Sequence, residues 1–327
     1  MLQNNTLKTV LKSLLSVLLS GWLLYSLYHQ LKHQPHLPGA IHQLWYSLRS
    51  KTIYLFPPLF LLWMLNLGLE TQKWRILLRR TERMNFNTAL LSVFSGIAIS
   101  MITPNRIGEY LGRILYLRNA KKGEGITVTV IGSFAQLIVS AFFGFTGTIF
   151  YIGWVRYTSW LLLLAGISLI LLGVLSYLYF HLKKVLDWIR PYAFLRKLIP
   201  YLRILRRIPR RELHQILLYS AGRYMVYSLQ FYLLLHLCLA ETNLLPGMGS
   251  IFLIFWSLVL LPSIAIAEIG IRGQTALYFL MPVCGNELGI LSATVLLWLM
   301  NLVVPALLGC VFLYRGRWFD SEQAQKG

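Results

Sequence analysis

The chain has 327 residues, of which 57% are hydrophobic and only 13% are charged, and its mean hydropathy is +0.61. This composition excludes a soluble protein, because so few charged side chains could not coat the surfaces of one or two globular domains. Lys and Arg outnumber Asp and Glu by 31 to 11, which gives a net charge of +20. The basic residues lie in short runs between long apolar stretches, so we expect their acidic partner to be a phospholipid surface and not a nucleic acid.

Six apolar stretches are long enough to cross a bilayer, which requires about 20 residues in a helix. They cover residues 10–28, 53–69, 126–152, 160–180, 213–239 and 289–314. We interpret the first as a span and not as a signal peptide, because it is too long for the apolar core of a signal sequence and no small-residue cleavage site follows it.

Two shorter apolar stretches, residues 88–103 and 250–263, each end near a proline that is followed by charge and glycine. The first lies between two basic segments, residues 70–87 and 118–122. Basic loops face the cytoplasm, so the chain between these segments must enter the membrane and return to the cytoplasmic side. The first broken stretch therefore predicts a re-entrant hairpin that opens to the cytoplasm.

The second broken stretch has the opposite surroundings, because residues 240–249 and 281–288 contain no Lys or Arg. The second hairpin is therefore predicted to open to the outside. By the same rule we expect both chain termini to lie in the cytoplasm.

Together these features predict an all-α, polytopic membrane protein in a single domain, residues 1–327, with about six full spans and two re-entrant hairpins. The order span, hairpin, span occurs twice in opposite orientations, at about residues 53–152 and 213–314, with a basic interfacial linker at 181–212. Inverted repeats with interrupted helices are typical of transporters. The alternative is a set of six or eight plain spans without internal symmetry.

Six charged residues remain at membrane depth once the loops are accounted for. They are Arg106, Glu109, Arg113, Arg223, Glu268 and Arg272. A charge at the centre of a bilayer costs on the order of 3 kcal/mol on insertion scales, so six together indicate a functional site. Four residues are predicted to form the hairpins, since proline breaks a helix and glycine permits close backbone approach: Pro104, Gly108, Pro262 and Gly270.

The spacing of the charges indicates how they pair. Glu109 and Arg113 are four residues apart, as are Glu268 and Arg272, so each pair would share one face of a helix. We predict that the arginines bind a lipid phosphate, because their planar fork matches phosphate oxygens, and that the glutamates hold the arginines or take up protons. The alternative is that the ion pairs only lock the hairpins together.

At these residues the sequence resembles the transmembrane region of lysylphosphatidylglycerol synthase, a family often called flippase-like. The matching stretches are residues 103–109 (TPNRIGE) with Arg113, residues 261–263 (LPS), residues 268–273 (EIGIRG) and the preceding KWR at 73–75. The resemblance implies translocation of an anionic, aminoacylated or polyprenyl-linked lipid across the bacterial inner membrane.

The chain departs from this family's pattern at four positions. Ala267 and Glu268 stand where more glycine is expected, Gly273 where an acid is common, and Gln136 where an arginine is common. Family members that transfer lysine have an additional soluble catalytic domain after the membrane part. We expect no such activity in this chain, and we expect a separate enzyme to make any modified lipid that it handles.

No nucleotide-binding loop, nucleophile elbow or metalloprotease motif appears in the sequence, which argues against an ATP-driven pump and a standard hydrolase. We therefore expect no cofactor. A loop with His29, His33, His36 and His42 has no accompanying acid or cysteine, so we expect no metal there. The linker mixes basic and apolar residues between prolines, which indicates short amphipathic helices on the anionic inner leaflet, with a docking surface for a partner enzyme as the alternative.

The predicted function is that of a lipid translocase and not of an enzyme. A membrane-embedded transferase that acts on a lipid-phosphate carrier, with Glu109 or Glu268 as its base, is one alternative. A lipid-binding scaffold without catalytic activity is the other. Leaflet exchange without chemical change distinguishes the translocase from both.

Overall fold

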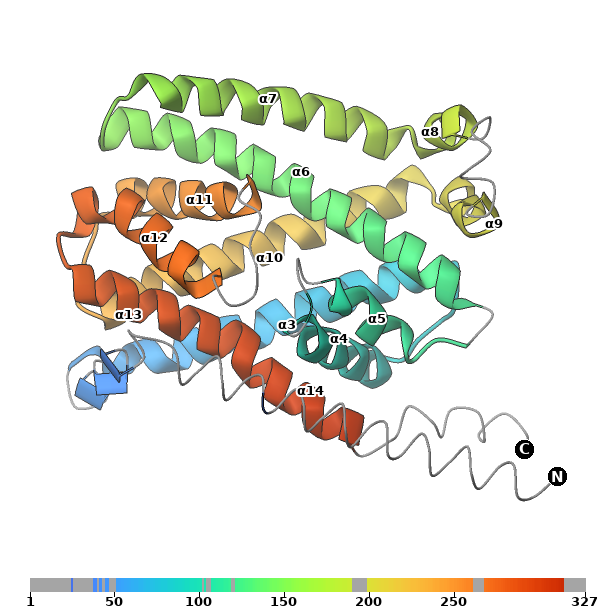
Figure 1. Cartoon of the computed structure of the whole chain (residues 1–327), viewed down its shortest axis with the longest axis horizontal. Coiled ribbons are helices and arrows are strands. Elements are labelled where there is room, and N and C mark those ends of the chain that lie inside the picture. The colour runs from blue at the N-terminus through green and yellow to red at the C-terminus, as the bar shows by residue number, and fades with distance from the viewer. Residues whose placement is uncertain are drawn as a thin grey trace.

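Figure 1 shows a computed structural model of the chain. The structure describes residues 25, 38–39, 41–42, 45–46, 51–101, 103, 107–118, 121–189, 199–260 and 268–314. Every regular element of at least four residues in these ranges is a helix, which confirms the predicted all-α fold. Apart from Tyr25, the predicted first span lies outside the described residues, and so do Pro104, Arg106, Pro262 and the side chain of Glu268.

The first repeat consists of a long helix, a two-helix hairpin and a second long helix. After the short helix η1 (Lys51–Leu55), these are α3 (Phe56–Leu78), α4 (Phe86–Ser100), α5 (Gly108–Ile114) and α6 (Lys122–Trp154). Two prolines lie in the first turn of α3, where their missing N–H groups would have no intrahelical partner.

The second repeat has the same order of elements. They are α10 (Arg210–Leu237), α11 (Leu244–Leu260), α12 (Glu268–Cys284), α13 (Glu287–Trp298), the π-helical turn η6 (Leu299–Val303) and α14 (Val304–Tyr314). Gly285 has a φ of +66° and ends α12, and the Asn286 side chain then caps α13 by accepting a hydrogen bond of 3.0 Å from the backbone N–H of Gly289. Pro305 lacks an N–H and therefore cannot donate the regular backbone hydrogen bond of an α-helix. The π-helical turn ends at Val303, two residues before this proline.

Between the repeats lie α7 (Ser159–Phe180), α8 (Leu182–Ile189), α9 (Ile199–Leu202) and η5 (Arg203–Arg207). The last three are short helices within the predicted basic linker, in which Pro209 precedes α10. The described part of the linker therefore has the predicted short helices.

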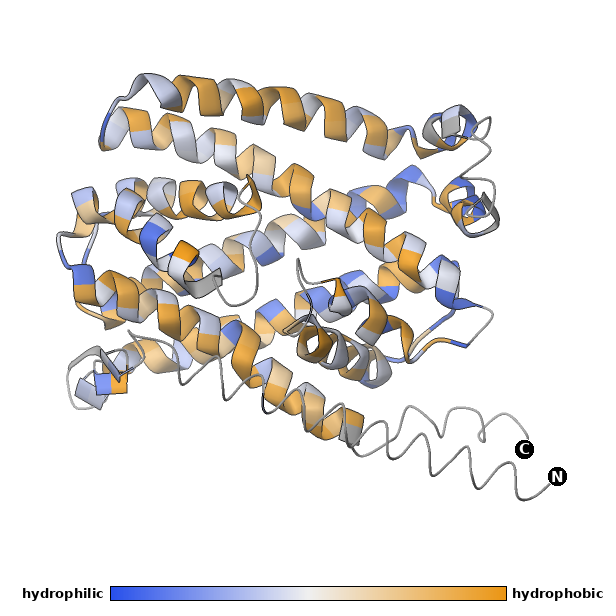
Figure 2. Ribbon diagram, viewed as in Figure 1, coloured by the Kyte–Doolittle hydropathy of each residue, from blue (hydrophilic) through white to orange (hydrophobic). Residues whose placement is uncertain are grey.

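Four helical stretches in the described ranges are long and apolar enough to cross a membrane: Ile53–Leu78, Lys122–Trp154, Ser159–Phe180 and Glu287–Leu313. Figure 2 shows apolar residues along the lengths of these helices, with hydrophilic residues at the two ends of the molecule and also partway along some helices. The predicted span 213–239 is also a helix, α10, but it is more polar than the four, so its crossing of the membrane stays a prediction.

The two hairpins open to opposite ends of the helix bundle, as the sequence predicts. In Figure 1 the connections from α3 to α4 and from α5 to α6 lie toward the right, whereas those from α10 to α11 and from α12 to α13 lie at the left. The packing follows the same inverted pattern, because α11 packs on α6 and α14 packs on α4. The first helix of each hairpin thus lies against the last long helix of the other repeat, and α3 packs along α10 between them.

Candidate functional site

The centre of the candidate site is a carboxylate that the sequence analysis did not select. Glu70 of α3 is 3% exposed and has a cation on each side. Its Oε1 lies 2.6 Å from the Arg113 guanidinium, and its Oε2 lies 2.8 Å from Lys73 Nζ and 2.7 Å from Arg223 Nη1. Glu109 pairs with the same guanidinium nitrogen of Arg113. We call these five residues the Glu70 cluster.

Arg113 is the most enclosed cation of the cluster and joins α5 to α3. Its guanidinium carbon lies 5.5 Å from the centre of the Trp74 ring, within reach of a cation–π interaction. The Trp74 Nε1–H donates to Ser92 Oγ at 3.0 Å, and the Ser92 hydroxyl donates to the backbone carbonyl of Arg113, also at 3.0 Å. Three helices therefore fix the position of this side chain.

Glycines allow α5 to approach α4 closely enough for this arrangement. A Cβ atom on Gly112 would lie 2.5 Å from both the Gly96 Cα and the Ser95 carbonyl oxygen, and one on Gly108 would lie 2.4 Å from the Ile99 carbonyl oxygen. The Gly108 N–H also donates to Thr103 Oγ1 at 2.7 Å. Gly108 thus lies at a close backbone contact of the first hairpin, whereas a Cβ on Gly270 would meet nothing within 4 Å. The hairpin-forming roles of both glycines stay predictions.

Arg223 joins the cluster to the second repeat. Its Nε–H donates to Asn66 Oδ1 at 3.0 Å, and the Asn66 side-chain amide donates to Asn301 Oδ1 at 2.8 Å. Asn301 lies in the π-helical turn η6. Turns of this kind often mark functional sites in helices.

Two cavities meet at Arg223. The first has a volume of about 240 Å³ and includes all five residues of the Glu70 cluster in its wall. The second has a volume of about 340 Å³ and includes Arg272 of α12 and Asn301. Gln136 of α6 and Arg223 belong to both walls, so the cavities adjoin and connect the two repeats.

The walls of the two cavities are positively charged. Their described side chains include four cations and two carboxylates: Lys73, Arg113, Arg223, Arg272, Glu70 and Glu109. Gln136 Oε1 is buried and accepts no hydrogen bond from the described residues. The arrangement can therefore bind an anion that also has a hydrogen-bond donor, since buried polar atoms and charges require partners.

The structure brings together four of the six predicted site residues. Glu109, Arg113 and Arg223 lie in the Glu70 cluster, and Arg272 lies on the adjoining second cavity. Arg106 and the Glu268 side chain lie outside the described residues, so the predicted pairing of Glu268 with Arg272 is not described either.

The predicted end of the second span was wrong. Residue 69 was its expected last residue, yet α3 continues to Leu78 and buries both Glu70 and Lys73 inside the bundle. Lys73 therefore does not belong to a basic loop. A hydropathy profile places the end of a span at the first charged residues and does not show whether those charges neutralise one another. The spacing of three residues between Glu70 and Lys73, which puts both on one face of a helix, was the available signal.

The sequence pattern of one protein family, the lysylphosphatidylglycerol synthase TM region, matches residues 11–309 of the chain. The chain belongs to this family. The match includes both hairpins and every residue of the Glu70 cluster. The family is tied to lipid biology by its synthase members, and so is this membrane protein as one of the family. A comparison with curated proteins found no match.

No group of histidine, cysteine or acidic side chains in the described part of this family member is arranged to hold a metal ion. Of the predicted histidine loop, only His42 is among the described residues.

Proposed function

We propose that the protein is a lipid translocase that moves an anionic, aminoacylated or polyprenyl-linked lipid between the leaflets of the bacterial inner membrane. The observation that supports this proposal most strongly is the excess of cations over carboxylates among the described side chains of the two adjoining cavities. The first cavity is lined in part by α5 of the first hairpin, and the second in part by α11 and α12 of the second hairpin. The two hairpins open to opposite ends of the bundle (Figure 1). Transporters built from inverted repeats bind their substrates at such a meeting point.

In this proposal the lipid phosphate takes the place of Glu109 beside Arg113. Glu109 is the more accessible partner, because its side chain is 26% exposed, whereas that of Glu70 is 4% exposed. A phosphate that enters the first cavity would displace Glu109 and receive paired hydrogen bonds from the guanidinium. Glu70 would meanwhile keep Arg113 and Arg223 in place.

Arg223 and Gln136 then transfer the head group between the cavities, since both residues belong to both walls. Arg272 would bind the phosphate in the second cavity. The Gln136 carbonyl oxygen would accept a hydrogen bond from a hydroxyl or ammonium group of the lipid, which suits a glycerol or aminoacyl head group.

The experiment is leaflet exchange of labelled phosphatidylglycerol in liposomes that contain the purified protein. We expect Arg272→Gln to slow exchange by about tenfold or more, which corresponds to ~1.4 kcal/mol of lost transition-state stabilisation. Arg156→Gln is the matched control, because Arg156 is an exposed arginine away from both cavities.

Unchanged exchange in Arg272→Gln would contradict the proposal. A lipid that is chemically altered by the protein, without exchange, would instead support the transferase, with Glu109 as the base that faces the cavity. If the Arg272→Lys variant keeps full exchange, Arg272 acts only through its positive charge and not through paired hydrogen bonds to the phosphate.

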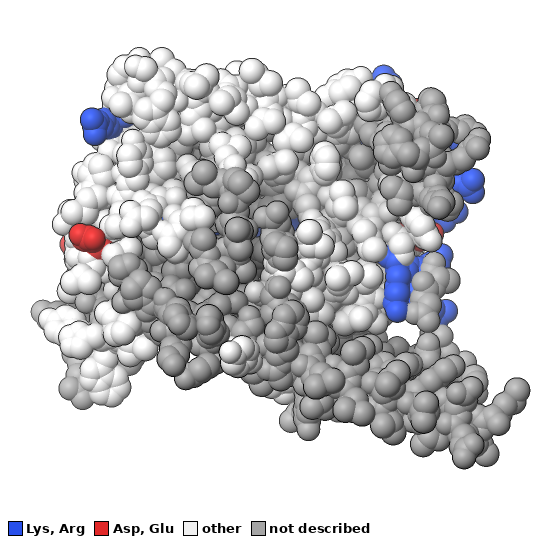
Figure 3. Space-filling view, viewed as in Figure 1, with Lys and Arg blue, Asp and Glu red and all other residues white. Residues whose placement is uncertain are grey.

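We also propose that the end of the bundle with the basic loops faces the cytoplasm, together with both termini. Figure 3 shows most of the visible Lys and Arg at the right end of the molecule. This asymmetry supports the proposal by the positive-inside rule. We further propose that a separate lipid-modifying enzyme supplies the lipid on this side.

A further inference from the structure

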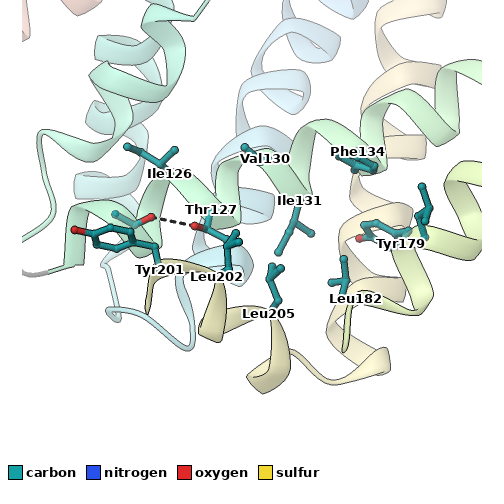
Figure 4. A pocket seen from close by; sticks show the side chains of 12 residues that line it. Ile126, Thr127, Val130, Ile131, Phe134, Tyr179, Leu182, Tyr201, Leu202 and Leu205 are labelled. Atoms are coloured by element: carbon teal, nitrogen blue, oxygen red, sulfur yellow. Dashed lines mark hydrogen bonds between the residues drawn. The ribbon is translucent and has the colours of Figure 1, made fainter. Parts of the chain in front are cut away.

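A third cavity, of about 560 Å³, lies outside the central site between α6, the end of α7 and the linker helices (Figure 4). Its wall has no residue in common with the two central cavities. On one side are Val130 and Phe134 of α6, and on the other are Leu202 and Leu205 of the linker. Its volume falls in the range of about 300–1,000 Å³ that is usual for binding sites of small molecules.

The polar groups of this wall are bonded within the protein. The Thr127 hydroxyl donates to the Gly123 carbonyl oxygen at 3.1 Å, and the Tyr179 hydroxyl donates to the Leu213 carbonyl oxygen, also at 3.1 Å. The remaining lining is apolar except for Tyr201, whose ring packs directly on the backbone of Gly123. The cavity therefore suits an apolar chain and offers little to a polar ligand.

Basic residues flank the lining residues in sequence at three places. Lys122 precedes Gly123, Lys183 and Lys184 follow Leu182, and Arg203 follows Leu202. Lys183, Lys184 and Arg203 are exposed. The described acids of the helices that line the cavity are paired, because Asp187 contacts Arg206 and Glu124 contacts Lys121. Lys183, Lys184 and Arg203, which we call the basic rim, thus bring exposed positive charge to the helices that line the apolar interior.

We infer that this cavity holds one acyl chain of an anionic phospholipid whose phosphate lies on the basic rim. The charge of the rim identifies the head group, and basic pockets between helices at the cytoplasmic side of membrane proteins bind anionic lipids. This lipid is separate from the transported one. It holds the linker helices against α6 and so stabilises the connection between the two repeats.

The test measures lipid retained by the purified protein, by native mass spectrometry, after extraction from vesicles of equal parts phosphatidylglycerol and phosphatidylcholine. We expect the wild-type protein to retain one phosphatidylglycerol in preference to phosphatidylcholine by about tenfold. Val130→Trp fills the cavity from a half-exposed position and should abolish this retention. Ile149→Trp is the control, because Ile149 lies on the same helix with similar exposure and lines none of the three cavities described above.

A second pair of variants tests the rim. Lys184→Gln with Arg203→Gln should remove the preference for phosphatidylglycerol, whereas Arg83→Gln with Arg156→Gln, which removes the same charge elsewhere, should keep it. The inference is overturned if the Val130→Trp variant retains as much phosphatidylglycerol as the wild-type protein. It is also overturned if the wild-type protein retains both lipids equally. The retention assay does not depend on transport, so this inference and the proposed function fail separately.

Discussion

At the scale of single residues, the two glutamates beside Arg113 have different roles. Both oxygens of Glu70 are engaged, one by Arg113 and the other by Lys73 and Arg223. Glu109 pairs with Arg113, and its side chain is 26% exposed in the wall of the first cavity. Glu70 is therefore the fixed partner of two buried cations, Lys73 and Arg113, and of the partly exposed Arg223. In the proposed function, Glu109 is the partner that an incoming anion replaces.

Replacing Glu70 with glutamine should strongly destabilise the protein. The isosteric amide fills the same space but leaves the buried Lys73 and Arg113 and the partly exposed Arg223 without their common counter-charge. Breaking a buried ion pair typically costs about 3–5 kcal/mol. The measurement is unfolding of the protein in mixed micelles with increasing denaturing detergent. Glu82→Gln is the matched control, because Glu82 pairs with the exposed Arg118, and exposed pairs contribute only about 0–1 kcal/mol.

If Glu70→Gln and Glu82→Gln unfold at the same detergent concentration, the cluster does not depend on Glu70, and the assignment of fixed and replaceable partners is wrong. A further variant separates stability from function. Glu109→Gln should unfold at nearly the same detergent concentration as the wild-type protein and still change the rate of lipid exchange.

The residues of the site differ in how far the sequence alone could identify them. Glu109, Arg113 and Arg272 stand out because the predicted hairpins place them at membrane depth, and Arg223 stands out because it lies inside an apolar span. Glu70 and Lys73 do not, since they follow an apolar stretch and so look like the start of a basic loop. Only the length of α3 in the folded protein shows that these two residues are inside the bundle. Asn66 and Asn301 are neutral, and only the fold brings them together across the repeats.

At the scale of elements, the first hairpin depends on contact between the backbones of α4 and α5. Gly112 and Gly96 lie against each other with no room for a side chain on Gly112. The sequence could predict this hairpin from its proline, glycines and charges. It could not predict that a glycine of one helix meets a glycine of the other, because that contact depends on the register of the two helices.

Gly112→Ala should therefore destabilise the hairpin and weaken the site. The new Cβ would meet backbone atoms at 2.5 Å, which cannot turn away, so α5 must shift and displace Arg113. We expect a loss of ~1–3 kcal/mol, as for overpacking in a core, measured by the same detergent unfolding. Gly68→Ala is the control, because a Cβ on Gly68 meets nothing within 4 Å and alanine favours a helix by about 0.5–1 kcal/mol. Equal stability of the two variants would show that α4 and α5 do not pack in this way.

At the scale of the whole molecule, the same construction appears twice in opposite directions. Close contacts through glycine join α11 to α6, where a Cβ on Gly147 would lie 2.6 Å from Phe252 Cβ. They also join α14 to α4, where a Cβ on Gly309 would lie 2.3 Å from the Phe94 carbonyl oxygen. Small residues at helix contacts are typical of membrane proteins, since close packing replaces the hydrophobic effect there. The central cavities lie where these two equivalent halves meet.

The inverted repeats predict that the loops before and after the first hairpin lie on one side of the membrane. The loops before and after the second hairpin should lie on the other side. We would replace the three native cysteines with alanine and introduce single cysteines at Arg83 and Arg118, beside the first hairpin, and at Asn243 and Glu287, beside the second. An impermeant maleimide added to cells whose outer membrane has been opened should label Asn243→Cys and Glu287→Cys. It should label Arg83→Cys and Arg118→Cys only after the inner membrane is broken, because the basic end faces the cytoplasm. Labelling of all four from one side would mean that the hairpins share an orientation, and the central cavities would then not be open to alternate leaflets.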